Sequence, residues 1–111
     1  MPSKPMGLLQ GTLDVIVLRA LAHEPRHGYG VAEWIRRVSE GILEIEDGAL
    51  YTALHRLQKR GLLDASWGVS DNNRRAKYYR LTSRGHQELE ASEREWTRYA
   101  EVMARVLAAR S

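Results

Sequence analysis

The sequence predicts a mostly α-helical fold with a small β-hairpin, in which three compact helices precede the hairpin and a long helix follows it. Apolar residues recur at helical spacing in three segments before residue 61. Two runs of strand-forming residues then flank a turn-rich stretch at 70–76. The last thirty residues again show apolar positions at helical spacing. A chain of 111 residues has room for one modest domain of this kind.

The composition is that of an ordinary globular protein, with 43% hydrophobic and 28% charged residues. The absence of cysteine excludes a disulfide framework and a thiolate metal site, and we expect no cofactor. No apolar run is long enough to span a membrane, and the first ten residues lack a secretory apolar region, so we expect a cytoplasmic protein without a membrane partner. The net charge is only +3, so the distribution of basic residues matters more than their number.

The first helix is expected to start at Gly11 or Thr12, either of which can cap it, and to reach about Ala22. One stripe at helical spacing comprises Leu13, Ile16, Val17, Ala20 and Leu21. Val15 and Leu18 lie on the opposite side of this helix. A helix that is apolar nearly all round is buried on more than one face, so these two residues are candidate contacts with a second chain.

Pro25 ends the first helix, and 26–30 predicts a tight connection. A second helix follows to about Ser39, with Gly41 as its stop. Its expected inward residues are Val31, Ala32, Ile35 and Val38. The alternation in 43–46 resembles a very short strand.

A third helix is expected over 48–60, capped by Asp47 and closed by Gly61. Its expected core residues are Leu50, Ala53, Leu54 and Leu57. The opposite face carries polar groups of varied hydrogen-bonding type, namely Tyr51, Thr52, His55, Arg56 and Lys59. This face is either simply solvated or reads the edges of bases.

The hairpin is expected to pair 62–69 with 77–81. Its tip and exit strand are basic, and the candidate DNA contacts there are Arg74, Arg75, Lys77 and Tyr78. Successive residues of a strand point to opposite sides, so Tyr79 and Leu81 are expected in the core. Trp67 is expected to pack its ring on the body of the domain.

Thr82 is expected to cap a final helix about 40 Å long. Leu89, Trp96 and Met103 are seven residues apart, and Ser92, Tyr99 and Val106 follow each by three. Such interleaved heptads predict a seam for another helix, and a helix that outruns so small a body favours a second copy of the chain over its own domain. The candidate dimer contacts are Val15, Leu18, Leu89, Trp96, Tyr99, Met103 and Val106.

This order of elements predicts a winged helix-turn-helix domain over 1–81 and a dimerisation helix over 82–111. In that arrangement the third helix can enter the major groove of double-stranded DNA while the basic hairpin meets phosphates. A winged helix used only for protein–protein contact is the alternative, and the basic wing tip argues against it. A hydrolase is a further alternative, but the sequence has no visible set of nucleophile, base and oxyanion donors.

The stretch His23-Glu24-Pro25-Arg26-His27 matches the H-E-x-x-H pattern of zinc proteases. That pattern needs a continuous helix, which Pro25 and the following Gly28 interrupt. We therefore interpret the stretch as a polar turn between helices and expect no metal. A regulatory metal held by His23, His27 or His86 from two subunits is a separate hypothesis.

Several stretches together resemble the PadR family of bacterial transcriptional regulators. They are His27–Gly30, Gly48–Leu57, Arg60–Leu63 and Lys77–Thr82 with Gly85. The resemblance implies a homodimeric repressor whose third helix and wing bind a palindromic operator. Thr52 departs from the proline usual in the family, which affects only local contacts at that helix start. With one C-terminal helix, the chain resembles the short members of the family.

Trp96 is also a candidate effector site. It lies in the middle of the heptad seam, so two-fold symmetry would bring two indoles near each other. Some members of the family bind flat drug-like molecules between such helices. We therefore expect a small aromatic or cationic ligand, which indole faces attract, to relieve DNA binding there.

Overall fold

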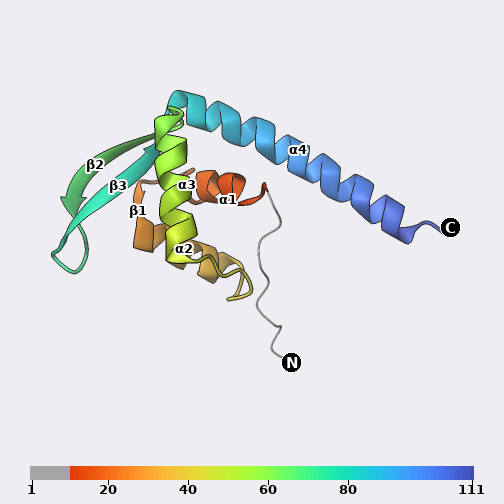
Figure 1. The fold of residues 1–111 in the computed structure, drawn as a ribbon, viewed down its shortest axis with the longest axis horizontal. Helices are drawn as coiled ribbons and strands as arrows, with labels where there is room; N and C mark the ends of the chain where they lie inside the picture. The colour runs from red at the N-terminus through yellow and green to blue at the C-terminus, as the bar shows by residue number, and fades with distance from the viewer. Residues whose placement is uncertain (1–10) are drawn as a thin grey trace.

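The computed structural model describes residues 11–111, which fold into four α-helices and a three-stranded antiparallel sheet (Figure 1). The first ten residues of the predicted 1–81 domain lie outside the described part. The elements in chain order are α1 Leu13–Ala20, β1 Arg26–His27, α2 Gly28–Val38, α3 Asp47–Lys59, β2 Leu63–Val69, β3 Arg75–Leu81 and α4 Ser83–Ala108. This order confirms the predicted winged helix-turn-helix fold with a long C-terminal helix.

The sheet has the order β1-β3-β2, with β3 in the centre. In the hairpin, Leu63 pairs with Leu81 at the base and Val69 pairs with Arg75 near the tip. At the other edge β1 contributes only two residues, which pair with Tyr78 and Tyr79 of β3. The hairpin therefore extends well beyond the short strand that joins it to the helices.

The core lies where α1, α2 and α3 meet the base of the hairpin. Its buried residues are Val17, Leu18, Ala20, Leu21, Val31, Ile35, Leu50, Ala53, Leu54, Leu57, Leu62, Leu63, Tyr79, Leu81 and Leu89. On α3 these residues form a single stripe, as the helical period predicts. The opposite face of α3 is thereby left free of the core.

The end of α3 has the hydrogen bonds of a Schellman motif. Gly61, at φ +79°, donates to Gln58, and Leu62 donates to Leu57. The predicted closure at Gly61 is confirmed, because its φ lies in the left-handed region that glycine tolerates. This tight stop turns the chain directly into β2.

The junction between β3 and α4 is also tightly held. The Thr82 hydroxyl accepts a hydrogen bond from the Gly85 amide at 3.0 Å and donates one to the Gly61 carbonyl at 2.7 Å. The predicted cap is therefore confirmed, and it links α4 to the end of α3. A Cβ at Gly85 would overlap the Leu62 carbonyl oxygen, so only glycine allows the first turn of α4 to lie this close.

The 26 residues of α4 extend far beyond the body, and the molecule is 57 Å along its longest axis (Figure 1). The inner half packs on α1, where Arg19 forms an ion pair with Glu93 at 3.3 Å. Every residue from 97 to 111 is exposed. The outer half of α4 thus has no partner within the described chain.

Several local predictions are wrong. The expected strand at 43–46 is only an isolated bridge at Leu43. The expected connection at 26–30 is instead β1 followed directly by the start of α2, because the His27 imidazole Nδ1 accepts a hydrogen bond from the Gly30 amide and caps that helix.

Two expectations about single residues of the helical part are also wrong. Asp47 is the first residue of α3 rather than its cap, which is Glu46. Val38, expected to point inward, is exposed.

Three side-chain predictions also need correction. Trp67 is not in the core: 60% of its surface is exposed, because the hairpin carries it past the body. Leu18 and Leu89, expected at a dimer interface, are only 1% and 4% exposed. Both are part of the chain's own core and have almost no surface left for a second copy. Tyr79 and Leu81 are buried as predicted.

Candidate nucleic-acid interface

The polar face of α3 is exposed along its whole length. This face comprises Tyr51, Thr52, His55, Arg56 and Lys59. It offers a phenol, a hydroxyl, an imidazole and two cations, which can donate to or accept from base edges and phosphates. The helix is anchored by its buried stripe, so these groups are presented on a rigid element.

The side of the hairpin that faces the core at its base becomes exposed to solvent toward its tip. Register places Trp67 opposite Lys77 and Val69 opposite Arg75, on the same side as the buried pair Leu63 and Leu81. We call the surface formed by Trp67, Val69, Arg75 and Lys77 the inner wing face. Along the strands, this surface follows directly after Ala65 and Tyr79, the last residues of the hairpin that pack in the core or against it.

A groove of about 920 Å³ lies between α3 and the inner wing face. Tyr51 and His55 line it from α3, and Tyr29 lines it from the start of α2. Its other lining residues include three cations, Arg74, Arg75 and Lys77, and two acids, Glu33 and Asp71. The groove therefore has more positive than negative side chains and borders the helix face that carries the most varied hydrogen-bonding groups.

Tyr79 forms part of the groove lining where the wing meets the body. Burial raises the pKa of its hydroxyl above the ordinary value, because the ionised form would lose its hydration. The Lys77 ammonium lies 5.4 Å from the centre of the Tyr79 ring. This part of the groove is thus a neutral aromatic surface that holds a cation.

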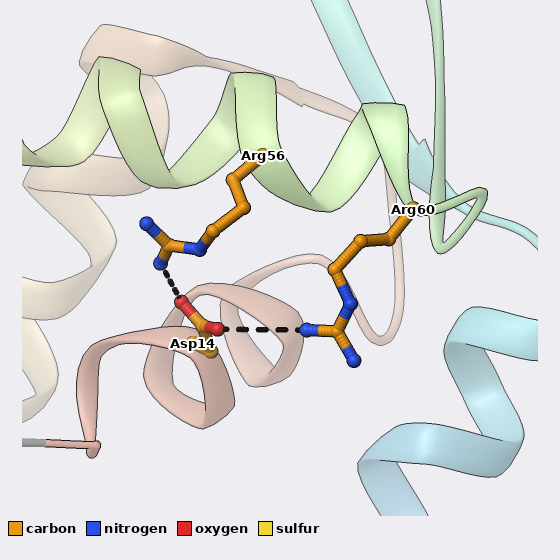
Figure 2. A network of polar contacts seen from close by, with 3 residues as sticks. All are labelled: Asp14, Arg56 and Arg60. Atoms are coloured by element: carbon orange, nitrogen blue, oxygen red, sulfur yellow. Dashed lines mark hydrogen bonds and ion pairs between the residues drawn. The ribbon is translucent and has the colours of Figure 1, made fainter.

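Arg56 does not line this groove. Figure 2 shows Arg56 of α3 and Arg60, the C-cap of that helix, reaching to the same carboxylate, that of Asp14 on α1. Arg56 donates to Oδ1 of Asp14, and Arg60 lies 3.7 Å from Oδ2. Asp14 thus partly neutralises Arg56 on the polar face of α3 and Arg60 next to that face.

Tyr78 lies on the outer face of the wing, opposite to Arg75 and Lys77. Its hydroxyl donates to the Val69 carbonyl at 3.2 Å, and its ring lies 5.2 Å from the His27 ring. The structure therefore brings Arg74, Arg75 and Lys77 together with Tyr51 and His55, but it does not bring Tyr78 into the same groove.

Two residues of this region escaped sequence reasoning. Trp67 was expected in the core because the sequence does not show where the hairpin leaves the body. Asp14 received no expected role from the sequence; as an acid in the first turn of α1 it favours the helix start. Asp14 is the only acid in α1, and this was the only available signal for its contact with Arg56.

The residues expected at a dimer contact lie mainly along α4. Tyr99, Met103 and Val106 are exposed, whereas Trp96 is half-buried. Trp96 and Val15 both line two grooves between α4 and the body, of about 850 and 510 Å³. The expected effector residue is thus brought to an open groove between α1 and α4.

The described residues do not favour a metal site or a membrane span. Within 11–111, no three His, Cys, Asp or Glu side chains are grouped so that they could hold a metal ion. His27 of the H-E-x-x-H stretch lies in β1 and caps α2, so the stretch is not a continuous helix. No helix in this part of the chain is both long and apolar enough to cross a membrane.

A winged helix with an exposed polar third helix beside a basic wing is typical of DNA-binding regulators. Residues 17–91 match the transcriptional regulator PadR-like family, and the chain belongs to that family. It is a family of transcription regulators and not of enzymes.

Individual relatives match most of the chain. A protein of Lysinibacillus sphaericus named only as uncharacterized is 34% identical over 97 residues, which cover 86% of this chain and 88% of that protein. A PadR family transcription regulator from Clostridium difficile is 30% identical, with a TM-score of 0.77 and coverage of 88% of this chain and 100% of that one. One from Eggerthella lenta is also 30% identical, with a TM-score of 0.77 and coverage of 91% and 86%.

Proposed function

We propose that this DNA-binding regulator is a homodimeric repressor that binds a palindromic operator. The observation that carries the proposal is the groove in which Tyr51 and His55 of α3 face the basic inner wing face. Residues of α3 would read base edges in the major groove, and Arg74, Arg75 and Lys77 would contact phosphates. The unit that binds DNA would be 1–81, and 82–111 would hold the dimer together.

The outer half of α4 supports the dimer. Its exposed apolar residues are Tyr99, Val102, Met103, Val106 and Leu107. Burying such a stripe against an identical helix is favourable at about 25 cal/mol per Å² of apolar surface. Two recognition helices must be about 34 Å apart to reach successive turns of the major groove. Among the described elements, α4 carries the most exposed large apolar residues, so it is the element proposed to set this distance.

Salt dependence tests DNA binding. In a gel-shift titration, affinity for duplex DNA should fall steeply with salt, because phosphate-bound cations are displaced on binding. A winged helix that serves only protein–protein contact would shift no duplex at any salt concentration. Sedimentation of the free protein should give a dimer, and selection from a random duplex library should return a site with two inverted half-sites.

We also propose that a planar cationic molecule relieves DNA binding from the groove between α1 and α4. The groove of about 850 Å³ is lined by Trp96 and Tyr99 and by two carboxylates without an ion pair among residues 11–111, Glu88 and Glu95. Its lining also includes Asp14, which already pairs with Arg60, and the cation Arg98. Aromatic faces and carboxylates both attract flat cations. A ligand that binds better to one separation of the long helices would favour that state.

Tryptophan fluorescence tests the effector site. A panel of planar cationic dyes should include at least one that quenches the emission saturably and weakens DNA binding. In the Trp96→Leu variant that saturable quenching should disappear. Quenching that persists in this variant, or no saturable quenching by any dye, would leave Trp96 as part of the helix seam alone.

A further inference from the structure

Trp67 is an unusual residue for the tip half of a hairpin. With 60% of its surface exposed, it lies beyond the core and does not stabilise the packing of the body. It points to the same side as Arg75 and Lys77 and lines the groove that faces α3. A large aromatic side chain at a basic, solvent-exposed surface therefore needs an explanation other than core packing.

The explanation lies in its contact with Arg75. Trp67 pairs with Lys77 across the hairpin, so Arg75 is its diagonal neighbour on the same face, a position that long side chains reach. The Arg75 guanidinium carbon lies 4.5 Å from the centre of the Trp67 ring, which is a cation–π contact. Lys77 lies instead over the ring of Tyr79, and Arg75 is the cation that lies over the indole.

Arg75 differs in this respect from the arginines of α3. Arg56 and Arg60 are held by the carboxylate of Asp14, which reduces their charge toward a polyanion. Among residues 11–111, Arg75 forms no ion pair with a carboxylate. An indole orders the guanidinium without neutralising it, and its N–H groups stay free at the edge of the plane.

We propose that Trp67 is a positioning residue for DNA binding: its ring holds the Arg75 guanidinium in the orientation that meets a DNA phosphate. Ordering a long side chain before binding removes an entropic cost that a free arginine meets on binding. The proposal rests on the proposed DNA-binding function and adds a specific role for a residue without charge.

A double-mutant cycle tests this role on the full chain. The probe is a fluorescently labelled 30-base-pair duplex of random sequence, because phosphate contacts do not depend on sequence. Trp67→Leu should weaken binding by roughly fivefold, the upper range for an exposed cation–π contact. Trp67→Tyr keeps an aromatic face and should bind within about twofold of the wild type. In an Arg75→Ala background, Trp67→Leu should change affinity by less than about twofold.

Two further measurements test whether the effect comes from the contact between Trp67 and Arg75. Arg80→Ala removes a cation from the outer face of the same strand and should weaken binding less than Arg75→Ala does. In the free protein, ¹⁵N relaxation of the Arg75 Nε–H group should show more motion in Trp67→Leu than in wild type and Trp67→Tyr. This second measurement does not need DNA.

The outcomes separate the two proposals. If Trp67→Leu weakens binding equally in both backgrounds, the indole contacts DNA by itself and the positioning role is wrong. Unchanged affinity in Trp67→Leu, or unchanged motion of Arg75, overturns it as well. If the wild-type chain binds no duplex even at low salt, the proposed function fails first, and this inference fails with it.

Discussion

The hairpin and α4 begin at one corner of the body and extend in different directions, and the outer half of α4 runs beyond the body (Figure 1). Both expose large side chains, but the surroundings of these side chains differ. On the wing, Trp67 lies among cations, with Arg75 over its ring. On α4, Tyr99 and Val106 are 59% and 61% exposed and belong to a continuous apolar stripe.

This difference indicates which partner each surface suits. A cationic surface with a single aromatic residue matches a polyanion, because the positive charges provide the attraction and the ring only holds a cationic side chain in place. A regular apolar stripe matches a second apolar stripe, since exposed apolar patches of this kind mark sites of association. The four predictions below would break or sharpen this distinction.

The largest effect is expected from charges placed on the apolar stripe of α4. Tyr99→Glu combined with Val106→Glu should give a monomer that no longer binds an inverted-repeat operator, because carboxylates would face each other across the seam. Sedimentation and operator titration measure both effects. The matched control, Ala104→Glu with Ala108→Glu, adds the same charge on the opposite side of α4 and should remain a dimer.

A smaller effect is expected at the groove. His55→Ala should weaken binding to a selected operator more than to random DNA, by about 1–3 kcal/mol of discrimination, if the imidazole reads a base edge. Arg56→Ala should reduce discrimination less, because its guanidinium already binds Asp14. Competition titrations with the two duplexes measure this. Equal losses on both duplexes in His55→Ala would move His55 to the phosphate-contacting class.

On the wing, the expected change is in salt dependence rather than in specificity. Arg74→Ala with Arg75→Ala should weaken binding to all duplexes alike and lower the slope of log affinity against log salt by about one to two. The slope is measured by titration at several salt concentrations. An unchanged slope would show that the wing does not touch phosphates.

The smallest effect concerns the junction between the two regions. Thr82→Val removes a helix cap and the hydrogen bond to Gly61, which should lower the free energy of unfolding by about 1–2 kcal/mol. Denaturant unfolding measures this loss. Thr82→Ser keeps the hydroxyl and should lose much less. An unchanged free energy of unfolding in Thr82→Val would show that the hydroxyl does not stabilise the junction.

Most of the fold could be predicted from the sequence, because its signals are local. The periodic stripe of α3, Gly61 and Thr82 each act through the residues next to them. The start of α2 could not be predicted, because His27 both pairs with β3 and caps the helix. A strand of two residues is too short to show the alternation of apolar and polar residues from which strands are predicted.

The candidate site was predicted less completely, since its arrangement depends on contacts between distant segments. The exposed face of α3 follows from helical spacing, and the basic wing follows from composition. The contact between Arg56 and Asp14 joins residues 42 positions apart, and no spacing rule anticipates it. Trp67 shows the same limit, because burial along a hairpin depends on where the body ends.

The tight junction at Thr82 makes the wing and α4 parts of one lever. No linker separates β3 from α4, and Gly85 lies directly against Leu62. With an arm of about 40 Å, a tilt of roughly 5° at one end displaces the other by about 3.5 Å, close to the axial rise of one nucleotide along a DNA strand. In the proposed dimer, a modest repacking of the two α4 helices would therefore move each wing by about the axial rise of one nucleotide.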